Sequence, residues 1–188
     1  MTTTSQSCVL VLHSSRFGQS TKIAQAVCAQ LNARGVATEL VELTNQTTPD
    51  PARHTGLALV MSVRYGHFDK AVERLIAHHQ AWLDSVPTLL VTVSLTARNP
   101  EKCDPAIHSY TRKFLESTPW KPTHTEVVAG MLEYPRYNIL DRVAIQLIMH
   151  MTKGPTDKHT VIEYTNWDRV AAMANEFADT VLAASNNE

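Results

Sequence analysis

The chain has 188 residues, of which 44% are hydrophobic and 19% charged, and its formal net charge at pH 7 is −1. That length suits one globular domain with a full core, so we expect residues 1–188 to form a single domain. The balanced charge excludes a general attraction to nucleic acid. The 3 cysteines lack metal-ligand spacing, which predicts no metal site and a reducing, cytoplasmic setting. We expect neither a secretory signal nor a membrane-spanning helix, because no apolar run reaches about 20 residues.

The first element is an apolar run at residues 9–12, typical of a strand buried on both faces of a parallel sheet. From Gln19 onward the apolar residues recur with a period close to that of a helix. The turn between them is a helix N-terminus, where unpaired backbone N–H groups and the helix dipole attract anions. Gly18 would let the backbone approach a ligand there, and the hydroxyls belong to Ser14, Ser15, Ser20 and Thr21. We predict a phosphate site; the alternative is a plain corner whose hydroxyls only cap the helix.

The rest of the chain alternates strand and helix patterns. We predict strands at residues 9–12, 37–43, 57–63, 89–93 and 127–132. We predict helices that begin at Gln19, at the capping residue Asp69, at Asp104 with Pro105, at residue 138 and at Asn166. The third of these should end near Ser117, and Thr165 with Asp168 resembles a capping box before the last helix. This alternation predicts an α/β fold with a parallel sheet covered by helices on both faces.

An extra segment, about residues 133–158, follows the fifth predicted strand and contains a helix over 138–153. One half of its helical wheel is apolar, with Ile139, Leu140, Val143, Ala144, Leu147, Ile148 and Met151. At roughly 24 Å it is too short to span a membrane core of about 30 Å. The first interpretation is that this stripe packs on its own domain. The alternatives are a helix on the bilayer surface, a gate over the active site, or a contact between copies of the chain.

Three loops follow the buried strands at residues 14–21, 62–68 and 94–98. Ligands of parallel sheets bind outside the carboxyl ends of the strands, so these loops should meet around one site. The first loop resembles the phosphate loop of flavodoxins, with Ser15 as its first hydroxyl and Gly18 as its small residue. His13 stands where an aromatic residue is usual, and Ser20 stands where threonine is usual.

The flavodoxin resemblance implies a doubly wound, five-stranded sheet of order 2-1-3-4-5 that binds FMN. Its phosphate would lie in the first loop and its ring between the other two, with Tyr65 as a stacking residue or simply a surface aromatic on a turn. The implied FMN-binding residues are Ser14, Ser15, Arg16, Phe17, Gly18, Gln19, Ser20, Ser62, Val63, Arg64, Tyr65, Gly66, Ser94, Leu95, Thr96, Ala97 and Arg98.

Longer motifs resemble a narrower family, the bacterial flavodoxin-like (G-type) protoporphyrinogen oxidases. They include residues 62–67, 97–102 and 110–114, and above all Tyr-Pro-Arg-Tyr at residues 134–137 within the insert. This resemblance implies FMN-dependent oxidation of protoporphyrinogen IX to protoporphyrin IX for haem biosynthesis, with electrons passed to ubiquinone or menaquinone. It also implies peripheral attachment to the inner face of the cell membrane.

A tetrapyrrole is a flat, mostly apolar disc with two propionates, so its site needs apolar walls and cations. The candidate substrate-binding residues are Tyr134, Arg136, Tyr137, Lys121 and Arg112. The residues do not identify a general base, and His67 and Tyr65 are the nearest titratable candidates. Two rivals stay open. One is a soluble flavin electron carrier or NAD(P)H–quinone reductase, which the long insert and near-neutral charge disfavour; the other is a flavodoxin-like module that has lost FMN.

Overall fold

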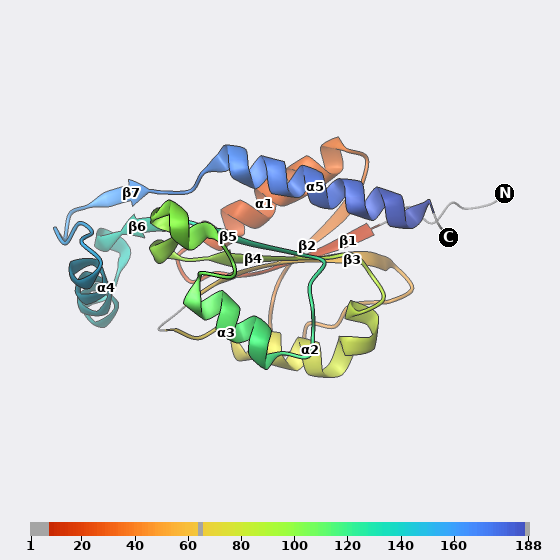
Figure 1. Ribbon diagram of the computed structural model, residues 1–188, viewed down its shortest axis with the longest axis horizontal. Coiled ribbons are helices and arrows are strands. Elements are labelled where there is room, and N and C mark those ends of the chain that lie inside the picture. Colours follow the sequence, from red (N-terminus) through yellow and green to blue (C-terminus); the bar gives the residue numbers. More distant parts are fainter. Residues whose placement is uncertain (1–7, 64–65, 187–188) are drawn as a thin grey trace.

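The computed structural model describes residues 8–63 and 66–186, and its centre is a five-stranded parallel sheet. The strands are β1 (Cys8–Ser14), β2 (Ala37–Glu42), β3 (His54–Ser62), β4 (Thr88–Val93) and β5 (His124–Val128). Their order, β2-β1-β3-β4-β5, confirms the predicted flavodoxin-like topology. The helices α1 (Gln19–Ala33) and α5 (Trp167–Ser185) cover one face, and α2 (Lys70–Leu83) and α3 (Ser109–Ser117) cover the other (Figure 1).

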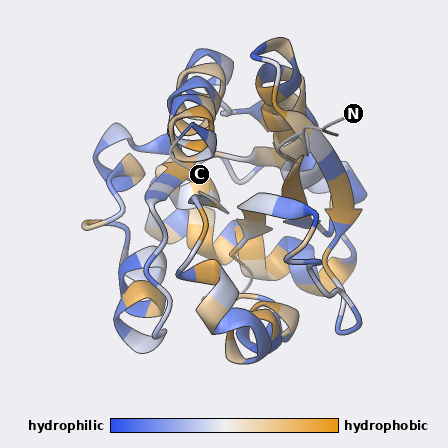
Figure 2. Cartoon of the chain, turned by 90° about the vertical axis from the view of Figure 1, so that its right-hand side faces the viewer, coloured by the Kyte–Doolittle hydropathy of each residue, from blue (hydrophilic) through white to orange (hydrophobic). Residues whose placement is uncertain are grey.

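Alternating side chains of the buried strands build a core on each side of the sheet. Val9 and Val11 pack with α1 and α5, whereas Leu10 and Leu12 pack with the residues of α2 and with Trp120. β2 lies at the edge, and none of its side chains is fully buried. Figure 2 shows the hydrophobic colour concentrated in the strands of the middle layer, while the helices carry both colours. The apolar runs therefore form strands because both of their faces are covered.

One predicted helix start and one predicted cap differ from the observed ones. α3 begins at Ser109 instead of Asp104, because the Asp104 carboxylate accepts the Ala106 N–H at 2.8 Å in a separate turn. The buried ring of His108 then caps the helix. α5 is capped by Asn166, whose side chain accepts the Arg169 N–H at 3.0 Å, so the predicted capping box at Thr165 is wrong. The predicted cap of α2 is confirmed, since Asp69 accepts the Ala71 N–H at 2.9 Å.

The strand predicted at residues 127–132 is two strands. β5 ends at Val128, and after Ala129 and Gly130 the chain leaves the parallel sheet. A methyl group on Gly130 would lie 3.1 Å from Val93, so the backbone passes close to β4 at this break. β6 (Met131–Glu133) then pairs antiparallel with β7 (Val161–Glu163) to form a second, small sheet.

The insert between these two short strands contains α4 (Ile139–Met151) and lies beyond the carboxyl ends of the parallel strands (Figure 1). Its own small core consists of Leu132, Tyr134, Tyr137 and Met149. The predicted apolar stripe of α4 is largely exposed, with Leu140 at 82% and Met151 at 75%. The interpretation that this stripe packs on its own domain is therefore wrong. Within the described residues, no helix is long and apolar enough to cross a bilayer.

Candidate functional site

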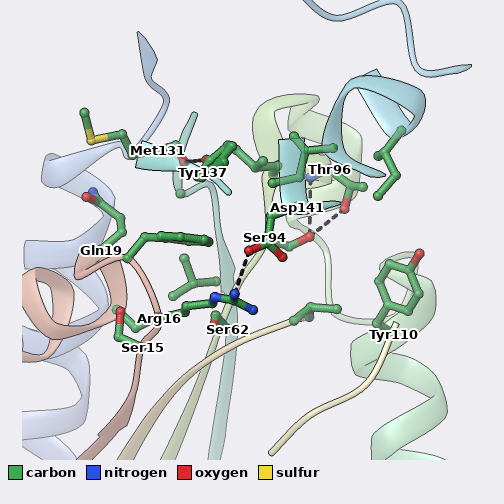
Figure 3. A pocket seen from close by; sticks show the side chains of 18 of the residues that line it. Ser15, Arg16, Gln19, Ser62, Ser94, Thr96, Tyr110, Met131, Tyr137 and Asp141 are labelled. Atoms are coloured by element: carbon green, nitrogen blue, oxygen red, sulfur yellow. Dashed lines mark hydrogen bonds and ion pairs between the residues drawn. The ribbon is translucent and has the colours of Figure 1, made fainter. Parts of the chain in front are cut away.

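A pocket opens at the carboxyl ends of the parallel strands, between the first loop and α4 (Figure 3). Its lining residues come from all three predicted loops and from the insert. They are Ser15, Arg16, Phe17, Gln19, Ser20, Ser62, Val63, Gly66, Val93, Ser94, Leu95, Thr96, Tyr110, Gly130, Met131, Tyr137, Asp141, Ile145 and Ile148. The structure thus brings together the loops that the sequence placed at one edge of the sheet.

The first loop has the features of an anion cradle. Gly18 adopts a left-handed conformation, with φ of +91°, and precedes the first residue of α1. Its N–H donates to the Ser15 hydroxyl at 3.0 Å, which tightens the turn. The Ser20 hydroxyl is buried and, among the described residues, has no hydrogen-bond partner. A buried polar atom without a partner costs free energy, so an oxygen-rich anion at the α1 N-terminus would stabilise it.

Arg16 and Phe17 join this loop to the insert. The Arg16 guanidinium forms an ion pair with Asp141 of α4, with Nη2 and Oδ2 2.7 Å apart. The Phe17 ring packs against Tyr137 with ring centroids 4.7 Å apart. Arg136 donates to the Phe17 carbonyl oxygen at 2.9 Å. The insert is therefore attached to the loop and forms the roof of the pocket.

The second loop contributes a wall. Gly66 has φ of +81°, and a methyl group there would lie 3.1 Å from the Tyr110 ring. Tyr110 of α3 lines the pocket, as Figure 3 shows. His67 is exposed and is not a lining residue. The predicted contacts of Arg64 and Tyr65 lie outside the described residues.

The third loop is fixed by a chain of hydroxyls that ends at a histidine. The Ser94 and Thr96 hydroxyls are 2.9 Å apart, and Thr96 is 3.1 Å from Nε2 of His108. Nδ1 of His108 accepts the Thr111 N–H at 3.3 Å, so Nε2 carries the proton and donates to Thr96. Burial lowers the pKa of His108 below its ordinary value, and Lys102 lowers it further. His108 is therefore a neutral support of the loop.

Several residues predicted to contact FMN have other roles in this structure. The Ser14 hydroxyl donates to Asp69 at 3.1 Å, and Ala97 is buried in a small cluster with Val127. Gly18 shapes the loop without lining the pocket. Arg98 donates to the carbonyl oxygen and the hydroxyl of Thr152, at 2.6 and 2.8 Å. Arg98 therefore ties the third loop to the C-terminal end of α4.

The predicted substrate-binding residues separate into two groups. Tyr137 lines the pocket, and its hydroxyl accepts the Glu133 N–H at 3.0 Å; burial raises its pKa. Arg136 is exposed beside the first loop, whereas Tyr134 is fully buried and donates to the Pro155 carbonyl at 2.9 Å.

Lys121 and Arg112 do not line this pocket. Lys121 precedes the amino end of β5, whereas the pocket is at the carboxyl ends of the strands, and its ammonium group donates to the Leu115 and Thr118 carbonyls. Arg112 is on the exposed side of α3, 3.9 Å from Glu116.

Seven lining residues were not predicted from the sequence: Val93, Tyr110, Gly130, Met131, Asp141, Ile145 and Ile148. Asp141 follows the helix cap Asn138 by three residues, which indicates a position in the first turn but not its partner. Tyr110 lies in one of the family-like motifs and Ile148 in the apolar stripe of α4, but neither pattern indicates a pocket. The packing of α3 and α4 directs these side chains and that of Ile145 into it.

A cluster of Cys8, Glu39 and His54 is compact enough to suggest a metal site. Nδ1 of His54 accepts the Asp50 N–H at 3.0 Å, so Nε2 carries the proton and donates to Glu39 at 3.1 Å. Arg53 also pairs with the same carboxylate oxygen of Glu39, at 2.9 Å. The histidine and carboxylate thus already satisfy each other, and this cluster does not fit a metal ion.

The comparisons with known proteins agree with the geometry. The flavodoxin domain model matches residues 10–159. The chain is 37% identical over 169 residues to protoporphyrinogen IX dehydrogenase (quinone) of Escherichia coli (strain K12). The matched region covers 90% of this chain and 93% of the relative. A protein of the same name from Leishmania major is 37% identical over 175 residues, covering 93% of this chain and 76% of the relative.

Two solved structures share the fold. A short-chain flavodoxin associated with a PDU bacterial microcompartment superposes with a TM-score of 0.50 at 12% identity, covering 95% of this chain and 99% of that chain. The flavodiiron protein from Giardia intestinalis gives a TM-score of 0.53 at 12% identity, covering 96% of this chain and 37% of that chain.

Proposed function

The chain belongs to the family of quinone-dependent protoporphyrinogen IX dehydrogenases, and we propose that it carries out the reaction for which those relatives are named, with FMN as its flavin. The substrate is protoporphyrinogen IX, the product is protoporphyrin IX for haem biosynthesis, and the electron acceptor is ubiquinone or menaquinone. The observation that carries the proposal is one pocket with a phosphate-type loop as its floor and the family insert as its roof.

FMN suits this pocket because its single phosphate matches the single anion cradle. The buried Ser20 hydroxyl, the Ser15 hydroxyl and the first N–H groups of α1 surround the place where a phosphate would bind. The ring would then reach the apolar strand ends at Val63 and Val93. A bound flavin accepts two electrons from one substrate and delivers them to another, which is the chemistry that the protein itself lacks.

The protein contributes walls that exclude water and orient a flat substrate. Leu95, Ile145 and Ile148 give the pocket apolar sides, and Tyr110 and Tyr137 add aromatic rings. Arg136 lies at the outer side of the first loop, where a propionate would find a cation. We place Tyr137 and Arg136 at the substrate, and we assign Tyr134 to the core of the insert.

We propose that α4 lies on the inner face of the cell membrane. Five exposed residues of its outer side are apolar and close together, with the exposed His150 among them: Ile139, Leu140, Val143, Leu147 and Met151. An amphipathic helix of this kind binds the interface of a bilayer without crossing it. Quinones are apolar and the tetrapyrrole ring is mostly apolar, so a helix of the insert against the lipid would place both reactants next to the pocket.

The reaction is tested with purified, FMN-loaded protein under anaerobic conditions. Protoporphyrinogen IX with a soluble quinone should yield protoporphyrin IX, which is measured by its fluorescence. Without quinone, protoporphyrinogen IX should reduce the flavin and bleach its absorbance. NAD(P)H should not reduce the flavin at a comparable rate. Reduction by NAD(P)H but not by protoporphyrinogen would favour the quinone reductase, and a colourless protein that takes up no FMN would favour the module without cofactor.

Membrane attachment is tested by flotation with liposomes that contain anionic phospholipid. The double variant Leu140→Gln, Leu147→Gln should float at least several-fold less than the wild type, because two exposed apolar anchors are lost. Leu40→Gln is the matched control, since Leu40 is an exposed apolar residue on the edge strand β2. Unchanged flotation, together with dimers that the double variant breaks, would instead assign α4 to a contact between copies of the chain.

A further inference from the structure

The ion pair between Arg16 and Asp141 joins two side chains that line the pocket from opposite elements (Figure 3). Arg16 belongs to the first loop, and Asp141 is in the first turn of α4. The Asp141 side chain is 6% exposed and that of Arg16 is 35% exposed, so the pair is partly shielded from water. The ion pair is one of the contacts that attach the insert to the first loop.

The proposed cofactor brings a second anion to the same loop. A phosphate beside Ser15 and Ser20 would lie within the turn that carries Arg16, and a guanidinium binds phosphate oxygens as well as carboxylate oxygens. If Arg16 turned toward the phosphate, its ion pair with Asp141 would weaken, and the Asp141 carboxylate would face a group of like charge.

We propose that Asp141 and the cofactor phosphate compete for Arg16. Asp141 therefore lowers the affinity for FMN, and cofactor binding weakens the tie between the first loop and α4. The Phe17–Tyr137 ring contact and the hydrogen bond from Arg136 to the Phe17 carbonyl do not include Asp141, although the Arg16 guanidinium also lies 5.4 Å from the centroid of the Phe17 ring. The loop end of the insert therefore stays attached while the first turn of α4 loses one of its contacts. This inference rests on the proposed function, because it requires FMN in the pocket.

The direct test is the affinity of the cofactor-free protein for FMN, measured by quenching of flavin fluorescence. Asp141→Asn keeps the size of the side chain and leaves the backbone N–H to the Asn138 cap, at 2.8 Å, in place. It should bind FMN about fivefold more tightly than the wild type, as expected when a competing ion pair is removed. Riboflavin has the same ring without the phosphate, and its affinity should be unchanged.

Two further variants isolate the competition. Asp84→Asn removes an exposed carboxylate at the end of α2 and controls for net charge. In a protein that already carries Arg16→Gln, Asp141→Asn should raise the affinity for FMN little further, because there is no guanidinium left to compete for. If Asp141→Asn raised the affinity for FMN equally in the Arg16→Gln protein, the cause would be simple repulsion between Asp141 and the phosphate, and the proposal would be overturned.

Hydrogen exchange gives a readout that does not depend on affinity. FMN, but not riboflavin, should speed exchange in residues 139–144 of the wild type, and Asp141→Asn should show the faster exchange before FMN is added. Weaker FMN binding by Asp141→Asn would mean that Arg16 bridges both anions, and it would sink the inference while leaving the proposed function intact. A protein that binds neither flavin would instead contradict the proposed function.

Discussion

Ser20 is the residue whose environment points most directly to a ligand site. Its hydroxyl is buried at the start of α1 without a partner among the described residues. Ser20→Ala should therefore weaken FMN binding by about tenfold or more, since a hydrogen bond to a charged group is lost. Without FMN the same variant should be as stable as the wild type or slightly more stable, because no unpaired hydroxyl is buried. Flavin titration and thermal unfolding measure the two effects.

The control for Ser20 is Ser117→Ala, which removes a hydroxyl at the far end of α3 that donates to the Phe114 carbonyl at 3.0 Å. This variant should keep its FMN affinity. Unchanged affinity in Ser20→Ala as well would mean that the phosphate does not enter the loop at the N-terminus of α1.

His108 makes the stability of the protein depend on pH. Burial lowers the pKa of His108 from its ordinary value of 6.5, so the folded state disfavours the protonated ring. Below about pH 6.5 the unfolded chain therefore binds more protons than the folded chain. The contribution of His108 to the stability of the folded state is full above about pH 6.5 and is lost as the pH falls below that value. The slope from one such group is at most about 1.4 kcal/mol per pH unit.

His108→Asn keeps a polar atom near the position of Nδ1, which caps α3, and removes the titrating ring. The unfolding free energy of this variant, measured by urea titration between pH 5 and 7, should fall less steeply than that of the wild type. His13 and His79, whose pKa values are also lowered by burial, leave part of the slope in place. His159→Asn, on the surface of the insert, serves as the control. Profiles of His108→Asn and wild type that run parallel would contradict the assignment.

At the scale of elements, α4 shows why an amphipathic pattern does not identify the side that faces the protein. The apolar stripe predicted an inward face, yet Asp141 and Met149 are the buried residues and the stripe is exposed. Periodicity shows that two faces differ, but the identity of the surface that covers each face is a tertiary property. Asp141 is buried because Arg16, far away in the sequence, neutralises it.

Arg98 holds the other end of α4, and this gives a prediction about that element. Its guanidinium donates to the Thr152 carbonyl, one of the orphan acceptors at a helix C-terminus. Arg98→Ala should speed hydrogen exchange in residues 149–154 by about fivefold, which corresponds to a loss of about 1 kcal/mol. Exchange in β1 and β3 should not change, because their core contains no residue of α4.

The matched control is Arg112→Ala, an exposed arginine on α3 whose closest carboxylate is 3.9 Å away. It should leave exchange in α4 unchanged. Equal exchange in Arg98→Ala and wild type would show that the Thr152 contact does not fix the helix end.

For the whole molecule, the insert has a core separate from the two cores of the sheet. The two principal cores contain no residue between 131 and 163, and the insert has a small core of its own. Its ends also meet, since the Tyr164 N–H donates to the Gly130 carbonyl at 3.1 Å. We expect that replacing residues 131–163 with an Asn-Gly turn yields a chain that still unfolds cooperatively, because such a turn joins antiparallel neighbours.

The excised chain should lose liposome flotation and bind FMN more weakly, since Arg16, Phe17 and Gln19 lose their partners in the insert. Circular dichroism during heating and flavin titration measure both properties. The uninterrupted chain carrying Leu140→Gln and Leu147→Gln separates the loss of the membrane face from the loss of the roof. Failure of the excised chain to fold would show that the sheet depends on the insert.

Local signals in the sequence were sufficient to predict the parallel sheet and most of the pocket-lining residues of the first and third loops. The strand order was predicted from the resemblance to flavodoxins. Buried strands, turn residues and the Asp69 cap each depend on neighbours in the chain, and the structure confirms them. The start of α3 was predicted wrongly because Asp104 with Pro105 suits an isolated turn as well as a helix N-terminus. The division of β5 from β6 was missed because residues 127–132 form one run of apolar residues and glycine across the break.

The sequence by itself determined an α/β domain with a parallel sheet covered by helices on both faces, and it predicted an anion loop after the first strand, because hydrophobic period and turn chemistry are properties of adjacent residues. Only the tertiary structure decided that Asp141 meets Arg16, that Tyr110 enters the pocket, and that the apolar side of α4 faces outward. Each of these depends on how segments distant in the chain pack together. Neighbouring residues in the sequence do not determine which side chains are buried or which charges pair.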